Sequence, residues 1–309
     1  MIRLSFTVEG RSVRAGRFLN LPFSALVSTS IHSGMPRDSV EGLRSDVKRV
    51  ELESEQLQQD LLFRLAGAGV QVRVFESQRA AGGRLATRRF EAASFDHGAQ
   101  YFTVRDPRFA TLVEKWEHDR VAARWTGRIV SFDEEGWEDI AGSPSAVASG
   151  DTGTVRYVGT PGMNAIAMAM AEGLAITYDR RVESLEPLLN TLDRVVVAVP
   201  ADRARTLVAG VPSLVEKIAG VTMKPSWPVM AAFEERVAAR FDAAFVNGSA
   251  LGWMARNTSK PKRDWKVDTW VLQATTAWSQ AHVDDQPEDV GAFLMEAFED
   301  LIRAGLPRA

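Results

Sequence analysis

Several residue types and patterns are missing from this 309-residue chain, and each absence excludes a class of chemistry. There is no cysteine, which rules out disulfides, thiolate nucleophiles and cysteine-ligated metals, so any redox chemistry must come from a bound cofactor. The four histidines, at positions 32, 97, 118 and 282, lack the spacing of a zinc-binding helix, and we predict no metal site. No apolar run approaches the length of a membrane span, and we predict no membrane partner.

Charge and short motifs narrow the choice further. The net charge is −3 with acidic and basic residues dispersed, so the chain lacks the basic field that a nucleic-acid partner requires. The sequence contains neither a P-loop nor the second flank of a nucleophile elbow after Gly248-Ser249-Ala250. We therefore expect a small-molecule substrate, and nothing in the sequence sets the oligomeric state.

The N-terminal segment has a distinct composition. Residues 1–36 carry four arginines and six serines against one acid, Glu9, which is typical of an organellar transit peptide and would place the protein in a mitochondrion or plastid. The alternative is a poorly ordered or unrelated leader on a cytoplasmic protein. We favour this alternative and assign residues 1–50 to the leader.

A helix, a glycine break and a strand follow. Leucines repeat at helical spacing over 51–66, and residues 70–76 form an apolar strand that ends in Glu76. This order matches the second half of a βαβ nucleotide-binding unit, in which the terminal acid binds ribose hydroxyls. The first half should bring a glycine-rich turn about 20 residues before Glu76. No glycine lies between Gly42 and Gly67, and residues 51–55 hold three glutamates that would repel a pyrophosphate.

Helix starts are predicted at two further places and near the C-terminus. Asp106-Pro107 supplies an N-cap and a proline at the first helical position, and Pro161-Gly162 begins a second helix. The last helix begins near Asp285 and Pro287 with an apolar stripe formed by Val290, Phe293, Leu294, Ala297, Phe298, Leu301 and Ile302.

The strand patterns predict two sheets. The run 192–200 is apolar and does not alternate, as expected of a parallel strand buried on both faces, and we place it in the sheet of strand 70–76. Residues 223–233, 245–256 and 267–278 indicate an antiparallel sheet. The loop 257–264 between the last two contains Lys260, Lys262 and Arg263, which we interpret as solubilising rather than as a nucleic-acid surface.

Three motifs carry a family resemblance. They are Val74-Phe75-Glu76, then Gly82-Gly83-Arg84-x-x-Thr87, and then Asp96-x-Gly98-Ala99-Gln100-Tyr101-Phe102-Thr103. This pattern resembles the flavin-dependent amine oxidase superfamily, and the segments 156–164 and 245–261 are similar to its renalase-like branch. The resemblance covers roughly residues 60 to 300.

The resemblance implies FAD as the cofactor. It implies that Glu76 holds the adenosine ribose, that Gly82 and Gly83 admit backbone to the pyrophosphate, and that Arg84 neutralises a phosphate. It assigns Gly98, Ala99, Gln100 and Tyr101 to the isoalloxazine ring, and the backbone of Val182 to adenine.

The family fold is α/β, with an FAD-binding doubly wound, Rossmann-like sheet interleaved with an antiparallel-sheet substrate domain. We expect the FAD-binding domain at 51–104 and 155–200, and the substrate domain at 105–154 and 201–309.

The implied activity is hydride transfer from an amine or a dihydronicotinamide-like substrate to flavin N5. No catalytic residue can be named, because spacing does not single out Lys224 as the lysine that many amine oxidases keep near N5.

The chain departs from the family pattern at three places, which are both ends and one internal segment. The first strand with its glycine turn, a β-hairpin near 186–192, and a C-terminal Gly-Asp segment that closes over flavin are all absent from the sequence. Whether the chain is an active enzyme is therefore open. The alternative is a non-catalytic remnant or interaction protein of the same fold that no longer binds FAD. An NAD-dependent dehydrogenase is less favoured, because Gly82-Gly83-Arg84 and Gly98-Ala99-Gln100-Tyr101 belong to the flavin pattern.

Overall fold

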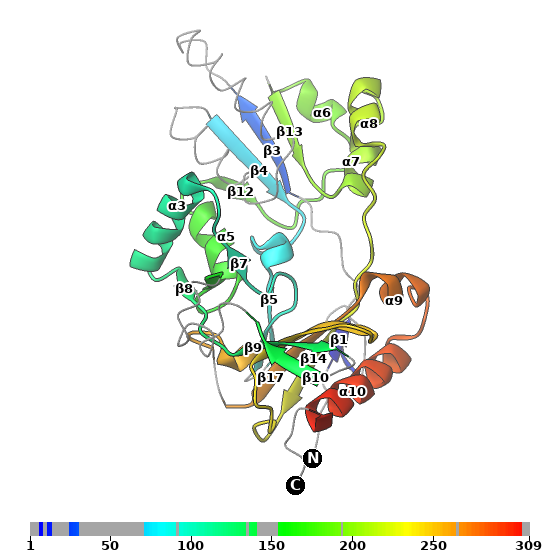
Figure 1. The fold of residues 1–309 in the computed structure, drawn as a ribbon. Coiled ribbons are helices and arrows are strands. Elements are labelled where there is room, and N and C mark those ends of the chain that lie inside the picture. The colour runs from blue at the N-terminus through cyan, green and yellow to red at the C-terminus, as the bar shows by residue number, and fades with distance from the viewer. Residues whose placement is uncertain are drawn as a thin grey trace. The chain divides into compact units, whose positions relative to one another are not determined.

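The computed structural model describes residues 71–90, 93–133, 136–140, 154–192, 194–263 and 266–304, together with the strands β1 (Phe6–Val8), β2 (Arg11–Val13) and β3 (Ala25–Ser30) (Figure 1). The predicted helix 51–66 lies outside the described residues. The chain divides into two compact units. Unit 1 comprises Met1–Asn20, Arg84–Ile166 and Lys224–Ala309, and unit 2 comprises Leu21–Gly83 and Ala167–Met223.

Unit 2 is built on a four-stranded sheet in the order β12 (Ala175–Thr177), β4 (Gln71–Glu76), β3 and β13 (Arg194–Ala198). Strands β12 and β4 are parallel, whereas β3 is antiparallel to both of its neighbours. The prediction that 70–76 and 192–200 share one sheet is confirmed, and the mixed α/β class with it. Strand β3 falls within residues 1–50, and its backbone pairs with β4 along six residues.

Strand β13 differs from the prediction in its environment. It pairs with an antiparallel neighbour, and residues 195–197 are half-buried rather than enclosed on both faces. Its apolar side chains pack on one side against the cluster of Phe75, Leu185, Leu207 and Val208. In the described part of unit 2, the helices after β12 are α6 (Glu186–Leu189), α7 (Ala201–Leu207) and α8 (Pro212–Ile218).

Unit 1 contains a six-stranded sheet in the order β10 (Gly136–Asp139), β9 (Ile129–Asp133), β15 (Ala243–Val246), β16 (Leu251–Arg256), β17 (Asp268–Ala274) and β14 (Pro228–Phe233). The pairing is antiparallel except between β15 and β9, so the antiparallel sheet is confirmed. The candidate strand 245–256 is in fact two strands, because the chain reverses at Gly248, whose φ of 70° favours glycine.

Smaller elements complete unit 1. Strands β5 (Thr87–Phe90) and β6 (Ala93–Asp96) form a hairpin, and β11 (Arg156–Gly159) lies between β7 (Phe102–Thr103) and β8 (Ala122–Arg124). The predicted helix starts are found in α3 (Pro107–His118), which Asp106 caps, and in α5 (Asn164–Ala171), where the chain passes into unit 2. Helices α9 (Thr276–Ala281) and α10 (Pro287–Ala304) follow β17.

Helix α10 closes the core of the six-stranded sheet. Phe298 is 1% exposed, and its ring centroid lies 5.1 Å from that of Trp270 and 6.0 Å from that of Phe233. The predicted apolar stripe is wrong at Phe293, which is 49% exposed. Phe293 stacks instead on Trp278 of α9, at 5.4 Å, and so leaves the core-facing side of the helix.

Phe298 and Phe293, which lie on different sides of α10, provide a matched test of how this helix packs. We expect Phe298→Ala to lower the free energy of unfolding by about 3–5 kcal/mol, because it leaves a cavity in a closed core. Phe293→Ala should cost less than about 1 kcal/mol, since much of that ring is already in water. Urea denaturation of the two variants measures both values, and equal losses would show that α10 is packed differently.

Candidate functional site

The residues that the sequence assigns to a cofactor fall in both units. Glu76, Gly82, Gly83 and Val182 belong to unit 2, and the segment from Arg84 to Tyr101 belongs to unit 1. Each group is described by itself.

Glu76 ends β4 and is 6% exposed. Its Oε1 accepts hydrogen bonds from the backbone N–H of Gln78 at 2.9 Å and from the Ser77 hydroxyl at 3.4 Å. Burial raises the pKa of Glu76, although the hydrogen bonds from Gln78 and Ser77 lower it. A carboxylate can accept about four hydrogen bonds, so Glu76 has the capacity to accept one from a ligand hydroxyl.

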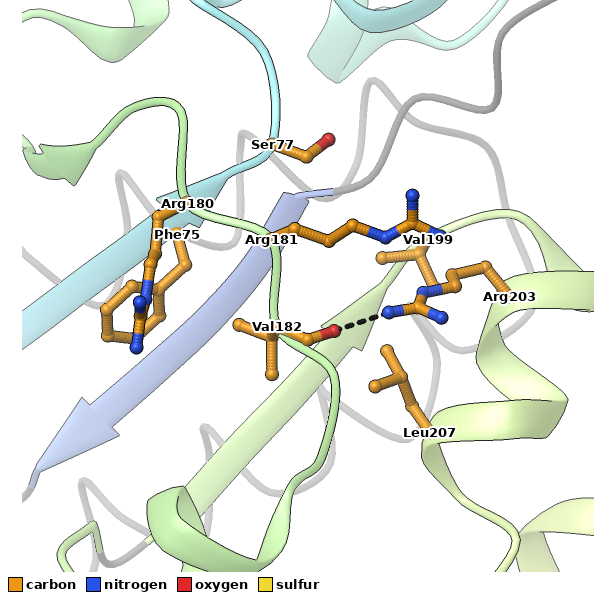
Figure 2. A pocket seen from close by; sticks show the side chains of 8 residues that line it. All are labelled: Phe75, Ser77, Arg180, Arg181, Val182, Val199, Arg203 and Leu207. Atoms are coloured by element: carbon orange, nitrogen blue, oxygen red, sulfur yellow. Dashed lines mark hydrogen bonds between the residues drawn. The ribbon is translucent and has the colours of Figure 1, made fainter.

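A shallow, open depression lies at this end of β4 (Figure 2). Apolar side chains line part of it, and three arginines at its margin favour negative charge. Arg181 and Arg203 also bind Glu183, at 3.1 and 2.7 Å, so part of their charge is already compensated. The lining residues are Phe75, Ser77, Arg180, Arg181, Val182, Val199, Arg203 and Leu207.

Val182 lines the pocket from the loop between β12 and α6. Its carbonyl oxygen accepts a hydrogen bond of 2.6 Å from Nη2 of Arg203. The loop is therefore anchored to α7, and the Val182 carbonyl is already engaged within the protein.

The Gly82-Gly83-Arg84 turn follows β4. Gly83 has a φ of 47°, a left-handed conformation that a side chain would strain, and it begins the short 3₁₀ helix Gly83–Leu85. Within unit 1, the Arg84 carbonyl accepts a 2.8 Å hydrogen bond from the Ala99 N–H, and the Arg84 side chain is exposed. This bond joins two of the sequence motifs, but a phosphate contact by Arg84 stays a prediction.

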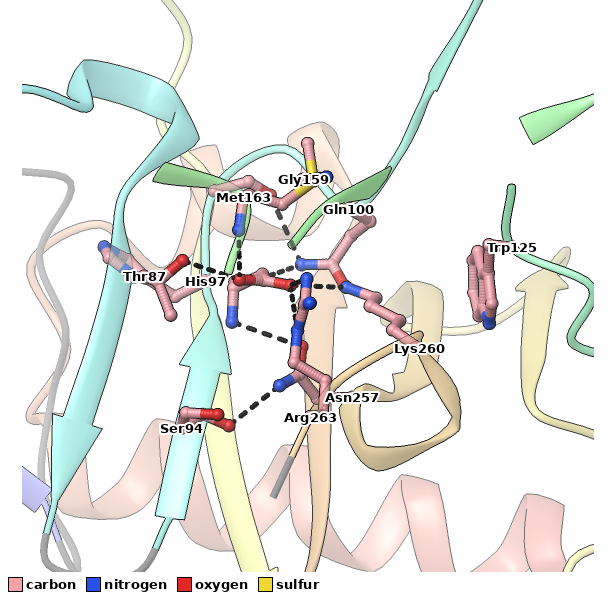
Figure 3. Close-up of polar contacts among 12 residues, drawn as sticks. Thr87, Ser94, His97, Gln100, Trp125, Gly159, Met163, Asn257, Lys260 and Arg263 are labelled. Atoms are coloured by element: carbon pink, nitrogen blue, oxygen red, sulfur yellow. Dashed lines mark hydrogen bonds and ion pairs between the residues drawn. The ribbon is translucent and has the colours of Figure 1, made fainter. Parts of the chain in front are cut away.

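Asp96, at the end of β6, is the centre of a buried polar cluster (Figure 3). Its Oδ1 accepts from the Thr87 hydroxyl at 2.7 Å and from the Met163 N–H at 3.0 Å. Its Oδ2 accepts from Nζ of Lys260 at 3.2 Å and from Nη2 of Arg263 at 2.7 Å. Burial raises the pKa of Asp96, but the two cations outweigh burial and bring it to about 2.

The position of Lys260 and Arg263 corrects the sequence interpretation. Both side chains are fully buried, so they do not solubilise the loop between β16 and β17. The loop turns inward because Asn257 donates to the Ser94 carbonyl at 2.8 Å and accepts from the Asp96 N–H at 3.3 Å. Burial lowers the pKa of Lys260 to about 8, against the opposing charge of Asp96.

The sequence carries two signals for this cluster. Asp96 follows the apolar residue Phe95 in a strand, and a buried carboxylate requires a cation. Asn257-x-Ser259-Lys260-Pro261 was also part of the family resemblance. By contrast, Lys224, the lysine considered in the sequence analysis, is exposed to solvent.

The Gly98–Tyr101 loop is held from inside the protein. Gln100 is 6% exposed, its Nε2 donates to the carbonyls of Asp96 and Gly98, and its Oε1 accepts from Lys260 at 3.1 Å. Gly98 is required by close approach, because a Cβ there would overlap the Arg84 carbonyl oxygen. The flavin contacts that the resemblance assigns to Gly98, Ala99, Gln100 and Tyr101 stay predictions.

Tyr101 belongs to an aromatic cluster within unit 1. Its ring centroid lies 5.6 Å from that of Trp253 and 6.2 Å from that of Trp125. The Arg156 guanidinium lies 5.3 Å from the same ring. Next to a reacting group, such a surface would exclude water and contact a planar ligand.

Within the described ranges, no group of three or more His, Asp and Glu side chains is placed to hold a metal ion. No helix in those ranges combines the length and apolarity needed to cross a bilayer.

A first prediction concerns Gly98. We expect Gly98→Ala to displace the loop and to lower the free energy of unfolding by about 1–3 kcal/mol, because the added methyl group meets backbone that cannot rotate away. Gly291→Ala in α10 is the control, since a Cβ at Gly291 meets nothing within 4 Å. It should be neutral or stabilising by up to about 1 kcal/mol. Urea denaturation measures the free energy of unfolding of both variants. If Gly98→Ala leaves it unchanged, the close approach of Gly98 to the Arg84 carbonyl is wrong.

A second prediction concerns His97. Burial, assisted by the charge of Arg88, lowers its pKa to about 4 from 6.5, so the folded protein holds it neutral. As pH falls from 6.5 to 4, the unfolded chain takes up a proton that the folded chain refuses, and stability falls by up to about 1.4 kcal/mol per pH unit. Asp96 adds its own loss only below about pH 3.8.

Stability measured from pH 7 to pH 4 tests this assignment. His97→Gln should flatten the curve, whereas His118→Gln, at an exposed position of α3, should leave it unchanged. An unchanged curve for His97→Gln would assign the acid sensitivity to other groups.

Comparisons with known proteins show which folds this chain is similar to. Residues 61–116 match the model of an NAD(P)-binding Rossmann-like domain. A protein designated a protoporphyrinogen oxidase from Exiguobacterium sp. 255-15 is similar with a TM-score of 0.54 and 10% identity, over 75% of this chain and 77% of that one. A putrescine oxidase redesigned in its cofactor binding by a double mutation is similar with a TM-score of 0.50 and 12% identity, over 76% of this chain and 77% of that one. The chain therefore combines a Rossmann-like segment with a fold that these two oxidases share.

Proposed function

We propose that this chain is an FAD-dependent oxidoreductase of the amine oxidase and renalase-like type, which transfers a hydride from an amine or a dihydronicotinamide-like substrate to flavin N5. The observation that carries the proposal is the position of Glu76. It is the buried acid at the carboxyl end of β4, inside the segment that matches a Rossmann-like domain.

The residues of unit 2 suit the adenosine part of FAD. Glu76 would accept hydrogen bonds from the ribose hydroxyls. The apolar side of the neighbouring pocket, with Val182, would contact adenine, and its arginines favour nearby phosphate charge. Gly82 and Gly83 lack the side chains that would keep a pyrophosphate from the backbone, and Arg84 would add a charge-assisted contact.

The residues of unit 1 suit the other end of the cofactor. The resemblance places Gly98–Tyr101 along the isoalloxazine ring, and the loop has the fixed backbone that such a contact requires. FAD, when bound, supplies the hydride acceptor. The chain's part would be to orient the substrate and exclude water, to which the aromatic surface of Tyr101, Trp125 and Trp253 is suited.

One observation favours a second candidate function, that of a non-catalytic protein of the same fold. Because β3 runs antiparallel to β4, Ala25 pairs with Glu76, so the start of β3 lies where a doubly wound unit has the end of its first strand. The described strand at this place in the sheet is therefore not a parallel first strand that a glycine turn would follow. The two candidates differ in whether FAD binds.

Flavin binding is the direct test. We expect purified protein incubated with FAD and desalted to show flavin absorbance at about one FAD per chain. Glu76→Gln should weaken FAD binding roughly tenfold or more, because the neutral amide accepts hydrogen bonds less strongly from the ribose. Glu172→Gln, at an exposed position of unit 2, is the matched control and should bind FAD normally.

The possible outcomes separate the functions. No flavin after reconstitution supports the non-catalytic candidate and rejects the enzyme. Bound flavin that an amine or a dihydronicotinamide bleaches anaerobically supports the oxidoreductase. NAD-linked turnover without flavin would instead indicate a dehydrogenase.

A further inference from the structure

Lys260 is buried more completely than its charge would lead one to expect. Its side chain has no exposed surface, and the ammonium has a partner in each of three directions. Nζ lies 3.2 Å from Oδ2 of Asp96, 3.1 Å from Oε1 of Gln100 and 5.6 Å from the ring centroid of Trp125. All three protons of the ammonium can therefore be directed at protein groups, which leaves none for a ligand.

Charge balance alone does not explain this lysine. Arg263 already neutralises Asp96, with Nη2 at 2.7 Å and Nε at 3.3 Å from the same oxygen. In the described part of the chain, no second carboxylate lies within ion-pair distance of Lys260 or Arg263. The cluster thus holds two cations and one anion, and the additional charge costs desolvation that some other contact must offset.

Lys260 donates a hydrogen bond to Gln100, whereas Arg263 donates to Asp96 and to the Pro261 carbonyl. Figure 3 shows Lys260 beside the Gln100 amide. With Oε1 held by Lys260, the amide has one orientation, in which Nε2 donates to the carbonyls of Asp96 and Gly98. Gln273 of β17 donates to the same Gly98 carbonyl at 3.0 Å. Without the ammonium, Oε1 of Gln100 would be a buried acceptor with no donor, and the amide would lose its fixed orientation.

We propose that Lys260 is a positioning residue that acts through Gln100 to fix the backbone of the Gly98–Tyr101 loop. The inference deepens the proposed function, on which its relevance to FAD depends, because the resemblance assigns this loop to the flavin ring. Because the ammonium of Lys260 is engaged by protein groups, Lys260 acts on the shape of the loop and not directly on a ligand.

The test measures loop order without FAD and then FAD affinity. In Lys260→Met, deuterium exchange of the peptide covering residues 97–103 should be at least about tenfold faster, because the Ala99 N–H bond to Arg84 opens more often. The unfolding midpoint should change little, because the relieved desolvation of the lysine offsets the unpaired Gln100 oxygen and Asp96 keeps Arg263. Lys260→Arg, which keeps a charged donor, should restore slow exchange. Lys262→Met, in the same loop but exposed, should have no effect.

The double variant Lys260→Met with Gln100→Met tests whether Lys260 acts on the loop through Gln100. If Lys260 acts through Gln100, Lys260→Met should add little further exchange to a Gln100→Met protein, which is already loose at 97–103. Should Lys260→Met fail to fold, Gln100→Met tests the same link with the lysine present. In the FAD-bound protein, we expect the dissociation constant of FAD to rise about tenfold in Lys260→Met and to be unchanged in Lys260→Arg.

The two claims can fail separately. Unchanged exchange at 97–103 in Lys260→Met, or additive effects in the double variant, overturns the positioning role. Faster exchange in a protein that never binds FAD supports the positioning of the loop and rejects the proposed function. Faster exchange with undiminished FAD affinity means that the loop does not border the cofactor, and the functional part of the inference is then wrong.

Discussion

The buried carboxylate of Asp96 is the interaction on which the order of unit 1 depends. It receives donors from β5, from the start of α5 and from the loop that joins β16 to β17. These three segments are far apart in the sequence, and in the described part of the chain no strand pairing joins them to one another. An ionised group at zero exposure is tolerated only when its oxygens are fully hydrogen-bonded, so the cluster fixes all three segments together.

The same requirement explains why the Gly98–Tyr101 loop is ordered without secondary structure. Gly98 lies against the Arg84 carbonyl, where a side chain cannot fit, and two glutamine amides bind its own carbonyl. The side chain of Gln100 is used inside the protein. What the loop can offer a cofactor is therefore its backbone and the ring of Tyr101, and the polar side chains behind it act as supports.

The sequence predicted the elements of this fold better than it predicted their environment. Asp106-Pro107 located α3, and the mixed pattern after residue 223 predicted the antiparallel sheet, because capping and alternation are local properties. Phe293, β13 and Lys260 were misjudged for one physical reason. Their burial depends on partners distant in the sequence: Trp278 for Phe293, β3 for β13, and Asp96 for Lys260. A loop of Lys, Pro, Ser and Thr has the composition of an exposed turn until a buried acid is shown beside it.

The direction of β3 decides how phosphate could be bound in unit 2. In a doubly wound unit, the turn after the first strand presents backbone N–H groups and a helix N-terminus to the pyrophosphate. Here the chain enters β3 at Ala25, which pairs with Glu76, so this described strand ends at the opposite edge of the sheet. Phosphate charge at this edge would then be balanced by side chains rather than by a helix dipole. Arg180, Arg181 and Arg203, gathered at the pocket beside Glu76, have the charge for that role. Because guanidinium groups on long side chains are held less rigidly than a backbone turn, such a site would orient the phosphates less strictly than the glycine-rich arrangement does.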